Sequence, residues 1–210
     1  YADLGDNSYK QLAFEYAQRS KARSFLDLLA GTSSNDPVSI EEVQSGIPDK
    51  NSVFLEYSLG DSSSYLWIIT PDEHQFIQLP SRDELRDKVE TFRFAAVEPQ
   101  ESNLDFYTES AFHLYEQLVK PAEPYLKKSG NLVILPDGIL HYIPFEALIT
   151  KDLSEENEWD YTNLPYLVHE YSISYGHSSS VLKNLLEQGD YNPMKEGTQE
   201  NLIAFGDPIY

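Results

Sequence analysis

Histidine and serine side chains are the groups in this 210-residue chain best suited to proton transfer and nucleophilic attack. The histidines are His74, His113, His141, His169 and His177. Three serines, Ser178–Ser180, directly follow the last of them, but a serine nucleophile needs a base and an orienting acid at hydrogen-bond distance. Chain neighbours rarely meet this geometry, and there is no Gly-x-Ser-x-Gly elbow. We therefore expect the serines to begin a helix, with a hydrolase built on His177 as the alternative.

Sequence motifs for metal ions and cofactors are absent. His169 and Glu170 begin a His-Glu-x-x-His pattern, but Ile173 occupies the position of the second histidine. The chain has no cysteine, which excludes thiolate metal ligands and thiol nucleophiles on this polypeptide. Neither a Gly-x-x-x-x-Gly-Lys loop nor a Gly-x-Gly-x-x-Gly turn occurs, and among 35 acidic residues no pair stands out. We expect no catalytic residue, no metal and no cofactor in this chain.

The charge balance restricts the partners that the chain can bind. Fifteen basic residues against 35 acidic ones give a formal net charge of −20, which opposes binding to nucleic acid or to an anionic lipid surface. No apolar run approaches the roughly 18 residues that cross a bilayer, and no secretory signal is present. We therefore expect a cytoplasmic protein that contacts neither nucleic acid nor membrane.

Hydrophobic periodicity in the first half of the chain predicts two helices followed by three strands. A basic helix is expected over about 8–30, and Ser39 with Glu42 forms a capping box for a second helix that ends at Gly46. Strands rich in β-branched and aromatic residues, separated by short turns, are expected at 53–59, 65–70 and 75–79. Such closely spaced strands are typical of an antiparallel meander.

The second half predicts helices followed by covered strands. Helices are expected at 81–96, where Ser81 and Glu84 suggest another capping box, and at 104–119. Strands follow at 132–135 and 171–175, then a helix over 178–188 and a last strand at 202–205. A continuous apolar run such as Leu132–Leu135 suits a strand covered on both faces. The sequence thus predicts an α/β layered fold with a mixed sheet that ends inside a larger fold.

The segment LPDGILHYIPFEAL, residues 135–148, stands out because a sharp turn separates two apolar stretches. We expect the Pro136–Gly138 turn to aim Tyr142 and Phe145 into a core. His141 then has two interpretations. It could hydrogen-bond a neighbouring backbone group or carboxylate, or it could contact a ligand near the carboxyl end of the preceding strand, where α/β sheets tend to bind ligands.

The same segment resembles the signature block of CHAT domains, the caspase-like domains often joined to tetratricopeptide repeats. Further blocks resemble the family in the same order: YAQRSKARSFLDLLAG (16–31), VFLEYSLGDSSSYLWIIT (53–70), YLVHEYSISYGHSSSVL (166–182) and LIAFGDPIY (202–210). Gly176-His177 stands where family members often carry a small residue and proline. The signature residues, to which we assign a structural role, are Asp137, Gly138, His141, Tyr142, Pro144, Phe145 and Glu146.

The resemblance implies a fold related to caspases and separase and a cysteine–histidine dyad that cleaves peptide bonds. In the family both dyad residues follow the strand that ends in Gly-Asp-Pro, here Gly206–Pro208, so neither can be assigned to this chain. The implied role is that of a supporting, pseudo-caspase-like part of a CHAT peptidase. Residues 1–36 would be a basic linking helix and linker, and 37–210 the amino-terminal part of the domain.

The implied partners are proteins: the remaining catalytic half, upstream tetratricopeptide repeats and the peptide substrate of the parent. The alternative is a stand-alone interaction module without a catalytic half. Its 15 tyrosines would supply a binding surface, and a partner peptide could add a strand to an open sheet edge.

Overall fold

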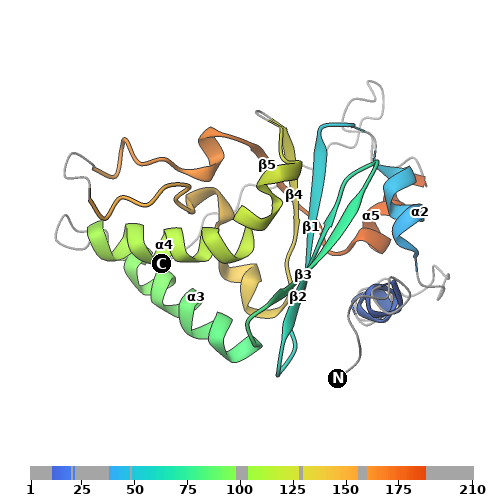
Figure 1. The fold of residues 1–210 in the computed structure, drawn as a ribbon, viewed down its shortest axis with the longest axis horizontal. Helices are drawn as coiled ribbons and strands as arrows, with labels where there is room; N and C mark the ends of the chain where they lie inside the picture. Colours follow the sequence, from blue (N-terminus) through green and yellow to red (C-terminus); the bar gives the residue numbers. More distant parts are fainter. Residues whose placement is uncertain are drawn as a thin grey trace, which may run out of the picture.

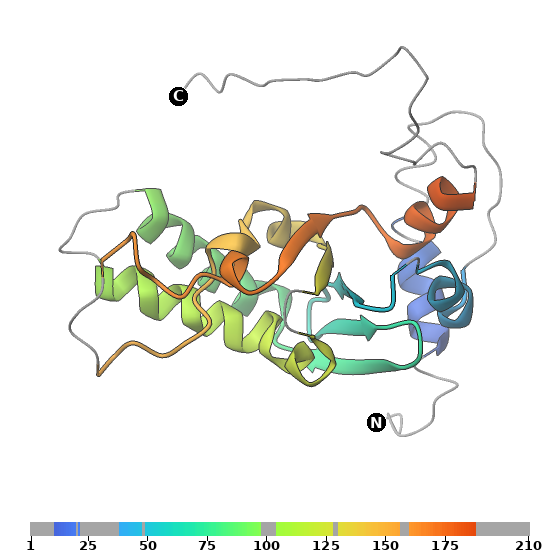
Figure 2. The same ribbon diagram turned by 90° about the horizontal axis from the view of Figure 1, so that it is seen from above.

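A computed structural model of the chain describes residues 11–19, 21, 38–47, 49–97, 104–127, 130–155 and 160–187. The linker at 32–37, the predicted strand at 202–205 and most of the predicted first helix beyond residue 21 lie outside these ranges. The described residues form three layers, with helices on both faces of a central sheet (Figures 1 and 2). The predicted α/β layered architecture is confirmed.

The central sheet has five strands in the order β3-β2-β1-β4-β5. Their bounds are β1 Ser52–Ser58, β2 Ser64–Ile69, β3 His74–Leu79, β4 Asn131–Leu135 and β5 Ser172–Tyr175. Strands β1, β2 and β3 pair antiparallel through short turns, which confirms the predicted meander. Strand β4 pairs parallel with β1, and β5 pairs parallel with β4, so the sheet is mixed as predicted.

Two long helices and a series of 3₁₀ turns cover one face of the sheet. They are α3 Arg82–Val97, α4 Leu104–Leu118, η2 Lys120–Tyr125, η3 Gly138–Tyr142, η4 Phe145–Ala147 and η5 Leu167–His169. The other face is covered by the helical residues 11–19, by α2 Ile40–Gly46 and by α5 Ser179–Glu187 (Figure 1).

The first turns of α2 and α3 test the two capping boxes predicted from the sequence. At α2 the Ser39 hydroxyl accepts from the Glu42 N–H at 3.2 Å, and the Glu42 carboxylate accepts from the Ser39 N–H at 2.9 Å. This reciprocal box lowers the pKa of Glu42, chiefly through the Ser39 backbone bond. At α3 the Ser81 hydroxyl accepts from the Glu84 N–H at 3.3 Å, but the Glu84 carboxylate accepts from the Ser81 hydroxyl rather than from its backbone N–H. The predicted second box is therefore only half formed.

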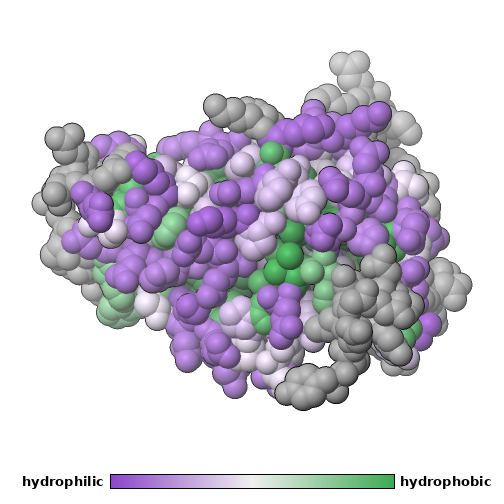
Figure 3. All heavy atoms as spheres, viewed as in Figure 1, coloured by the Kyte–Doolittle hydropathy of each residue, from purple (hydrophilic) through white to green (hydrophobic). Residues whose placement is uncertain are grey.

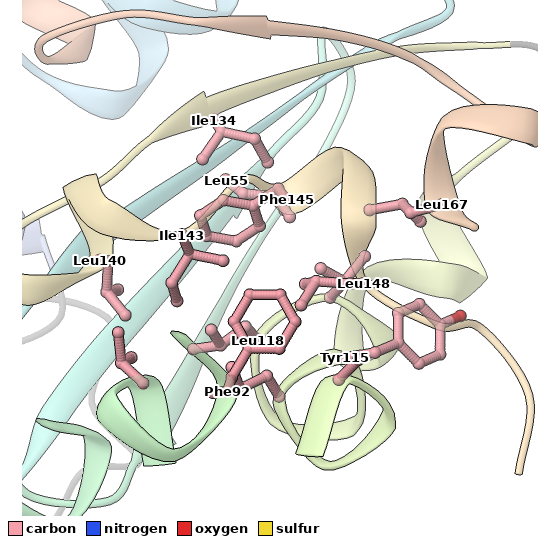
Figure 4. Packing of buried hydrophobic residues seen from close by; sticks show 14 of the residues in the cluster. Leu55, Phe92, Tyr115, Leu118, Ile134, Leu140, Ile143, Phe145, Leu148 and Leu167 are labelled. Atoms are coloured by element: carbon pink, nitrogen blue, oxygen red, sulfur yellow. The ribbon is translucent and has the colours of Figure 1, made fainter. Parts of the chain in front are cut away.

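Strand alternation divides the core into two clusters, one on each face of the sheet. Val53, Leu55 and Tyr57 of β1 belong to the cluster under α3 and α4, whereas Phe54 belongs to the cluster under residues 11–19 and α2. Figure 4 shows the larger cluster, where side chains of α3 and α4 meet those of the segment after β4. The labelled contributors include Phe92, Tyr115, Leu118, Leu140, Ile143 and Phe145.

The surface agrees with the acidic composition. The face seen in Figure 3 is mostly hydrophilic, interrupted by small hydrophobic areas. Of the helices described in the structure, none combines the length and the apolarity needed to cross a membrane.

Two phenylalanines on α3 give a matched test of the larger core cluster. Phe92 is fully buried, whereas Phe94 is 67% exposed. Replacing Phe92 by alanine removes a core ring and leaves a cavity, which we expect to lower the free energy of unfolding by about 3–5 kcal/mol. The same change at Phe94 should alter it by less than about 0.5 kcal/mol. Urea unfolding of both variants is the measurement, and equal losses would contradict this assignment of the helix faces.

Candidate functional site

The carboxyl ends of three parallel strands lie at one edge of the sheet, because β1, β4 and β5 run in the same direction. The segments that follow them are Leu59–Gly60 after β1, Pro136–Gly138 after β4 and Gly176–Ser178 after β5. These loops bring together the signature residues predicted from the sequence and the His177 region. Loops at the carboxyl ends of strands are the usual location of ligand and active sites in α/β sheets.

The turn after β4 is held by its aspartate and its glycine. The Asp137 carboxylate accepts a hydrogen bond from the Leu59 backbone N–H at 2.7 Å, which ties this turn to the end of β1. Gly138 adopts a φ of +52°, a conformation that favours glycine, and a Cβ there would lie 3.3 Å from Leu59 Cδ1. Asp137 and Gly138 therefore shape the backbone of the loops at this edge.

Two histidines face each other at this edge. The rings of His141, on η3, and His177, before α5, have centroids 6.3 Å apart in an edge-on arrangement. Partial burial lowers the pKa of His141, and the charge of His177 and that of Lys21 lower it further, while Asp137 opposes the shift. The interpretation that His141 contacts a ligand at this edge remains a prediction, and its observed neighbour is the His177 ring.

The rest of the signature segment packs partly as predicted. Phe145 is fully buried, but Tyr142 is 60% exposed, so the prediction that the turn aims both rings into the core is wrong for Tyr142. The short η3 turn places Tyr142 outward, where the Arg93 guanidinium lies 5.0 Å from its ring centroid. Pro144 precedes η4 with a φ of −73°, the value that its ring imposes.

A tyrosine hydroxyl joins β5 to the end of the signature segment. Tyr175 donates to the Glu146 carboxylate at 2.6 Å and accepts from the Phe145 backbone N–H at 3.0 Å. Burial and the bond to Glu146 raise the pKa of Tyr175, so its hydroxyl remains protonated at neutral pH. Glu146 is therefore an anchor for β5.

The three serines after His177 begin α5, as predicted. The Ser178 hydroxyl accepts from the Val181 N–H at 3.3 Å, which is the geometry of a helix N-cap. Ser179 donates to the Glu56 carboxylate and Ser180 to the Gln18 side-chain oxygen, and all three serines are buried. This arrangement gives no support to the alternative of a serine hydrolase.

The sequence analysis missed the residues that receive these serines. Glu56 is fully buried on β1, where it binds both Ser179 and the Lys21 ammonium group. The sequence feature that could have indicated this contact is the single carboxylate, Glu56, within the apolar predicted strand Val53–Leu59. A buried charge requires a partner, so that residue predicted a polar contact, although not which one.

A separate hollow of about 740 Å³ runs along α4 and the 151–155 loop. Its lining includes the carboxylates of Asp105, Glu109, Glu116 and Asp152. Glu116 is paired with Lys120 at 2.8 Å. Within the described ranges no three histidine, aspartate or glutamate side chains are arranged to hold a metal ion.

The fold and the site together define a class of protein: a layered α/β fold whose signature turn lies at the carboxyl edge of its parallel strands. Residues 108–208 match the family model of the CHAT domain, which confirms the resemblance seen in the sequence. The matched part contains β4, β5 and all of the signature residues. No curated protein matches the chain.

Replacing Asp137 by alanine tests whether the turn after β4 depends on its carboxylate. The variant leaves the Leu59 N–H without this acceptor, and hydrogen bonds to charged groups contribute about 1.5–3 kcal/mol. We expect a loss of that size in the free energy of unfolding measured in urea. Asp72, exposed in the turn between β2 and β3, is the matched control and should change stability by less than about 0.5 kcal/mol. Equal effects at both positions would contradict the anchoring role.

The histidine pair makes a prediction about pH. In the folded protein the pKa of His141 lies below its ordinary value of 6.5, so the unfolded chain binds more protons in this range. The contribution of His141 to stability is therefore present above pH 6.5 and lost as the pH falls. Titration followed by ¹H–¹⁵N NMR of the imidazoles should give a midpoint below 6.5, and His177→Ala should raise it. His113→Ala, on α4, should leave it unchanged, and a midpoint at or above 6.5 would contradict the assignment.

Proposed function

We propose that this chain is the supporting, non-catalytic part of a CHAT-type caspase-like cysteine endopeptidase. The observation that carries the proposal is the CHAT-domain match over residues 108–208 in a chain that contains no cysteine. A cysteine peptidase needs a thiolate to attack the scissile carbonyl and a histidine to handle its proton. In this proposal both groups belong to the remaining CHAT sequence of the parent protein, and this chain supplies the scaffold on which they are held.

The arrangement of the sheet supports a scaffold role. Strand β5 is the last strand of the described sheet, and Ser172, Ser174 and Tyr175 are exposed. In a parallel ladder alternate residues direct their N–H and C=O groups to opposite sides, so half of the β5 backbone groups face away from β4. In the proposal the catalytic half pairs along this side. The carboxyl edge that carries Asp137 and His141 would then border the catalytic groups.

The same edge is the observation that favours the second candidate, a non-catalytic interaction module. An extended peptide from another protein could add to β5 by strand pairing, with exposed side chains such as Tyr175 contributing contacts. The two candidate functions differ in which polypeptide supplies the strand that pairs with β5. In the first it comes from the parent's own CHAT domain, and in the second from a separate partner.

The proposal predicts that peptidase activity requires a second polypeptide. Residues 1–210 alone should cleave no member of a broad peptide library and should take no label from a serine-reactive fluorophosphonate probe, because Ser178–Ser180 are buried at the start of α5. Co-expression with the remaining CHAT sequence of the parent, as a separate chain, should give a co-purifying complex that cleaves peptides. Activity is measured by mass spectrometry of the library.

The matched control is the same complex with the cysteine of the second polypeptide replaced by alanine, which should associate but not cleave. Cleavage by residues 1–210 alone, or labelling by the fluorophosphonate, would overturn the proposal. Absence of any association with the remaining CHAT sequence would favour the interaction module.

A further inference from the structure

The N-terminal segment, residues 11–19 and Lys21, is attached to the body by an apolar contact and by polar contacts buried beneath it. Phe14 is fully buried and packs edge-on against Trp67 of β2, with ring centroids 5.6 Å apart. Gln18 and Lys21 follow Phe14 by four and seven residues, and Gln18 contacts α5 whereas Lys21 contacts β1. Gln18 is completely buried, and the Lys21 side chain is 11% exposed.

Lys21 is fixed by two acceptors on β1. Its ammonium group lies 3.2 Å from Glu56 Oε1 and also donates to the Tyr57 backbone carbonyl. Glu56 is fully buried and sits opposite Trp67 and Leu135 on the neighbouring strands. A carboxylate in such apolar surroundings requires compensation by a charge and by hydrogen bonds, and Lys21 supplies the charge.

The second oxygen of Glu56 holds the start of α5. Glu56 Oε2 accepts from the Ser179 hydroxyl at 2.5 Å and from the Ser179 N–H at 3.3 Å. The next residue is held by the N-terminal segment instead, because Gln18 Oε1 accepts from the Ser180 hydroxyl at 2.7 Å and from its N–H at 3.1 Å. The N–H groups of Ser179 and Ser180 at the start of α5 are therefore satisfied by side chains from elsewhere in the chain.

We propose that these five residues, Gln18, Lys21, Glu56, Ser179 and Ser180, form a clasp that couples the position of the N-terminal segment to α5 and to the loop before it. Lifting the segment withdraws Lys21 and Gln18 together. Glu56 would then be buried with Ser179 as its only remaining partner in the clasp, and Ser180 would lose its acceptor. Water can replace the lost partners of Glu56 and Ser180 only if α5 moves away from the sheet, so lifting the segment favours the displacement of α5.

The loop between β5 and α5 transmits the movement to the carboxyl edge. Only Gly176, His177 and Ser178 separate the end of β5 from the start of α5. The Gly176 backbone is packed so closely that a Cβ would lie 2.7 Å from Leu135 Cδ2 and 2.9 Å from Leu182 Cδ1. A shift of α5 therefore displaces Gly176 and with it His177, whose ring contacts His141.

One atom of the clasp is left unsatisfied in the closed state. The Gln18 side-chain nitrogen is buried and finds no hydrogen-bond acceptor among the described residues. This penalty exists only while the segment is docked, so it reduces the free energy needed to lift it. The inference concerns contacts within this chain and holds whether or not the parent is a peptidase.

Hydrogen exchange of the full 210-residue chain, followed by mass spectrometry, tests the clasp. Lys21→Met removes the charge that compensates Glu56. We expect exchange in peptides covering 176–187 to accelerate at least about tenfold, because removing one partner of a buried ion pair is strongly destabilising. Exchange in β2 should remain at the wild-type rate, which shows that the sheet is still folded. Arg19→Met removes one positive charge from the exposed face of the same segment and should leave 176–187 unchanged.

Coupling between two parts of a protein is reciprocal, so a change in α5 must also loosen the N-terminal segment. Ser179→Ala on α5 should accelerate exchange in residues 11–19. If Lys21→Met unfolds the sheet, Gln18→Ala leaves the ion pair in place and should still accelerate 176–187. Faster exchange confined to 11–19 in the Gln18 and Lys21 variants, or confined to α5 in the Ser179 variant, would overturn the proposal.

Discussion

Strand β1 is paired on both sides and covered on both faces, and every other part of the structure is arranged around that constraint. Its first six residues are buried, and its alternation sends Leu55 and Tyr57 toward α3 and α4 but Phe54 and Glu56 toward the opposite layer. The apolar side chains need only complementary volume. Glu56 needs specific partners, and it finds them in Lys21 and Ser179, which lie far apart in the sequence. A single carboxylate in a buried strand thereby selects which segments may cover that face.

Several side-chain contacts from different loops lie together at the carboxyl edge of the parallel strands. Asp137 holds the end of β1, Tyr175 holds Glu146 and the Phe145 backbone, and His141 meets His177. Each contact joins a loop after one strand to a loop or strand beside it. The CHAT match covers the loops after β4 and β5, whereas β1 precedes it but belongs to the same sheet. In this chain the contacts at that edge therefore tie loops of the matched region to one another and to β1, a strand outside it.

Local chemistry could be predicted from the sequence, whereas long-range pairing could not. The Ser39 cap, the three strands of the meander and the serine start of α5 depend on residues within a few positions of one another, and the structure confirms them. The Pro136–Gly138 turn predicts a core position for Tyr142, but a 3₁₀ turn rotates successive side chains by a third of a turn, and only some can face inward. The partners of Glu56 could not be named, because one sequence contains no information on which distant lysine and serine meet it. The predicted boundary between a linking segment, 1–36, and the domain, 37–210, also stays a prediction.

The mixed sheet also fixes an order in which its parts can assemble. Strands β1 to β3 are joined by short turns, so the meander closes with little loss of chain entropy. Strand β4 must find β1 across a much longer stretch, because Ser52 pairs with Asn131, and both long helices lie between them. We therefore expect formation of the parallel half to be the slow step of folding. Until it is complete, one side of β1 remains an unpaired apolar edge, and the newly made chain is most exposed to self-association during that interval.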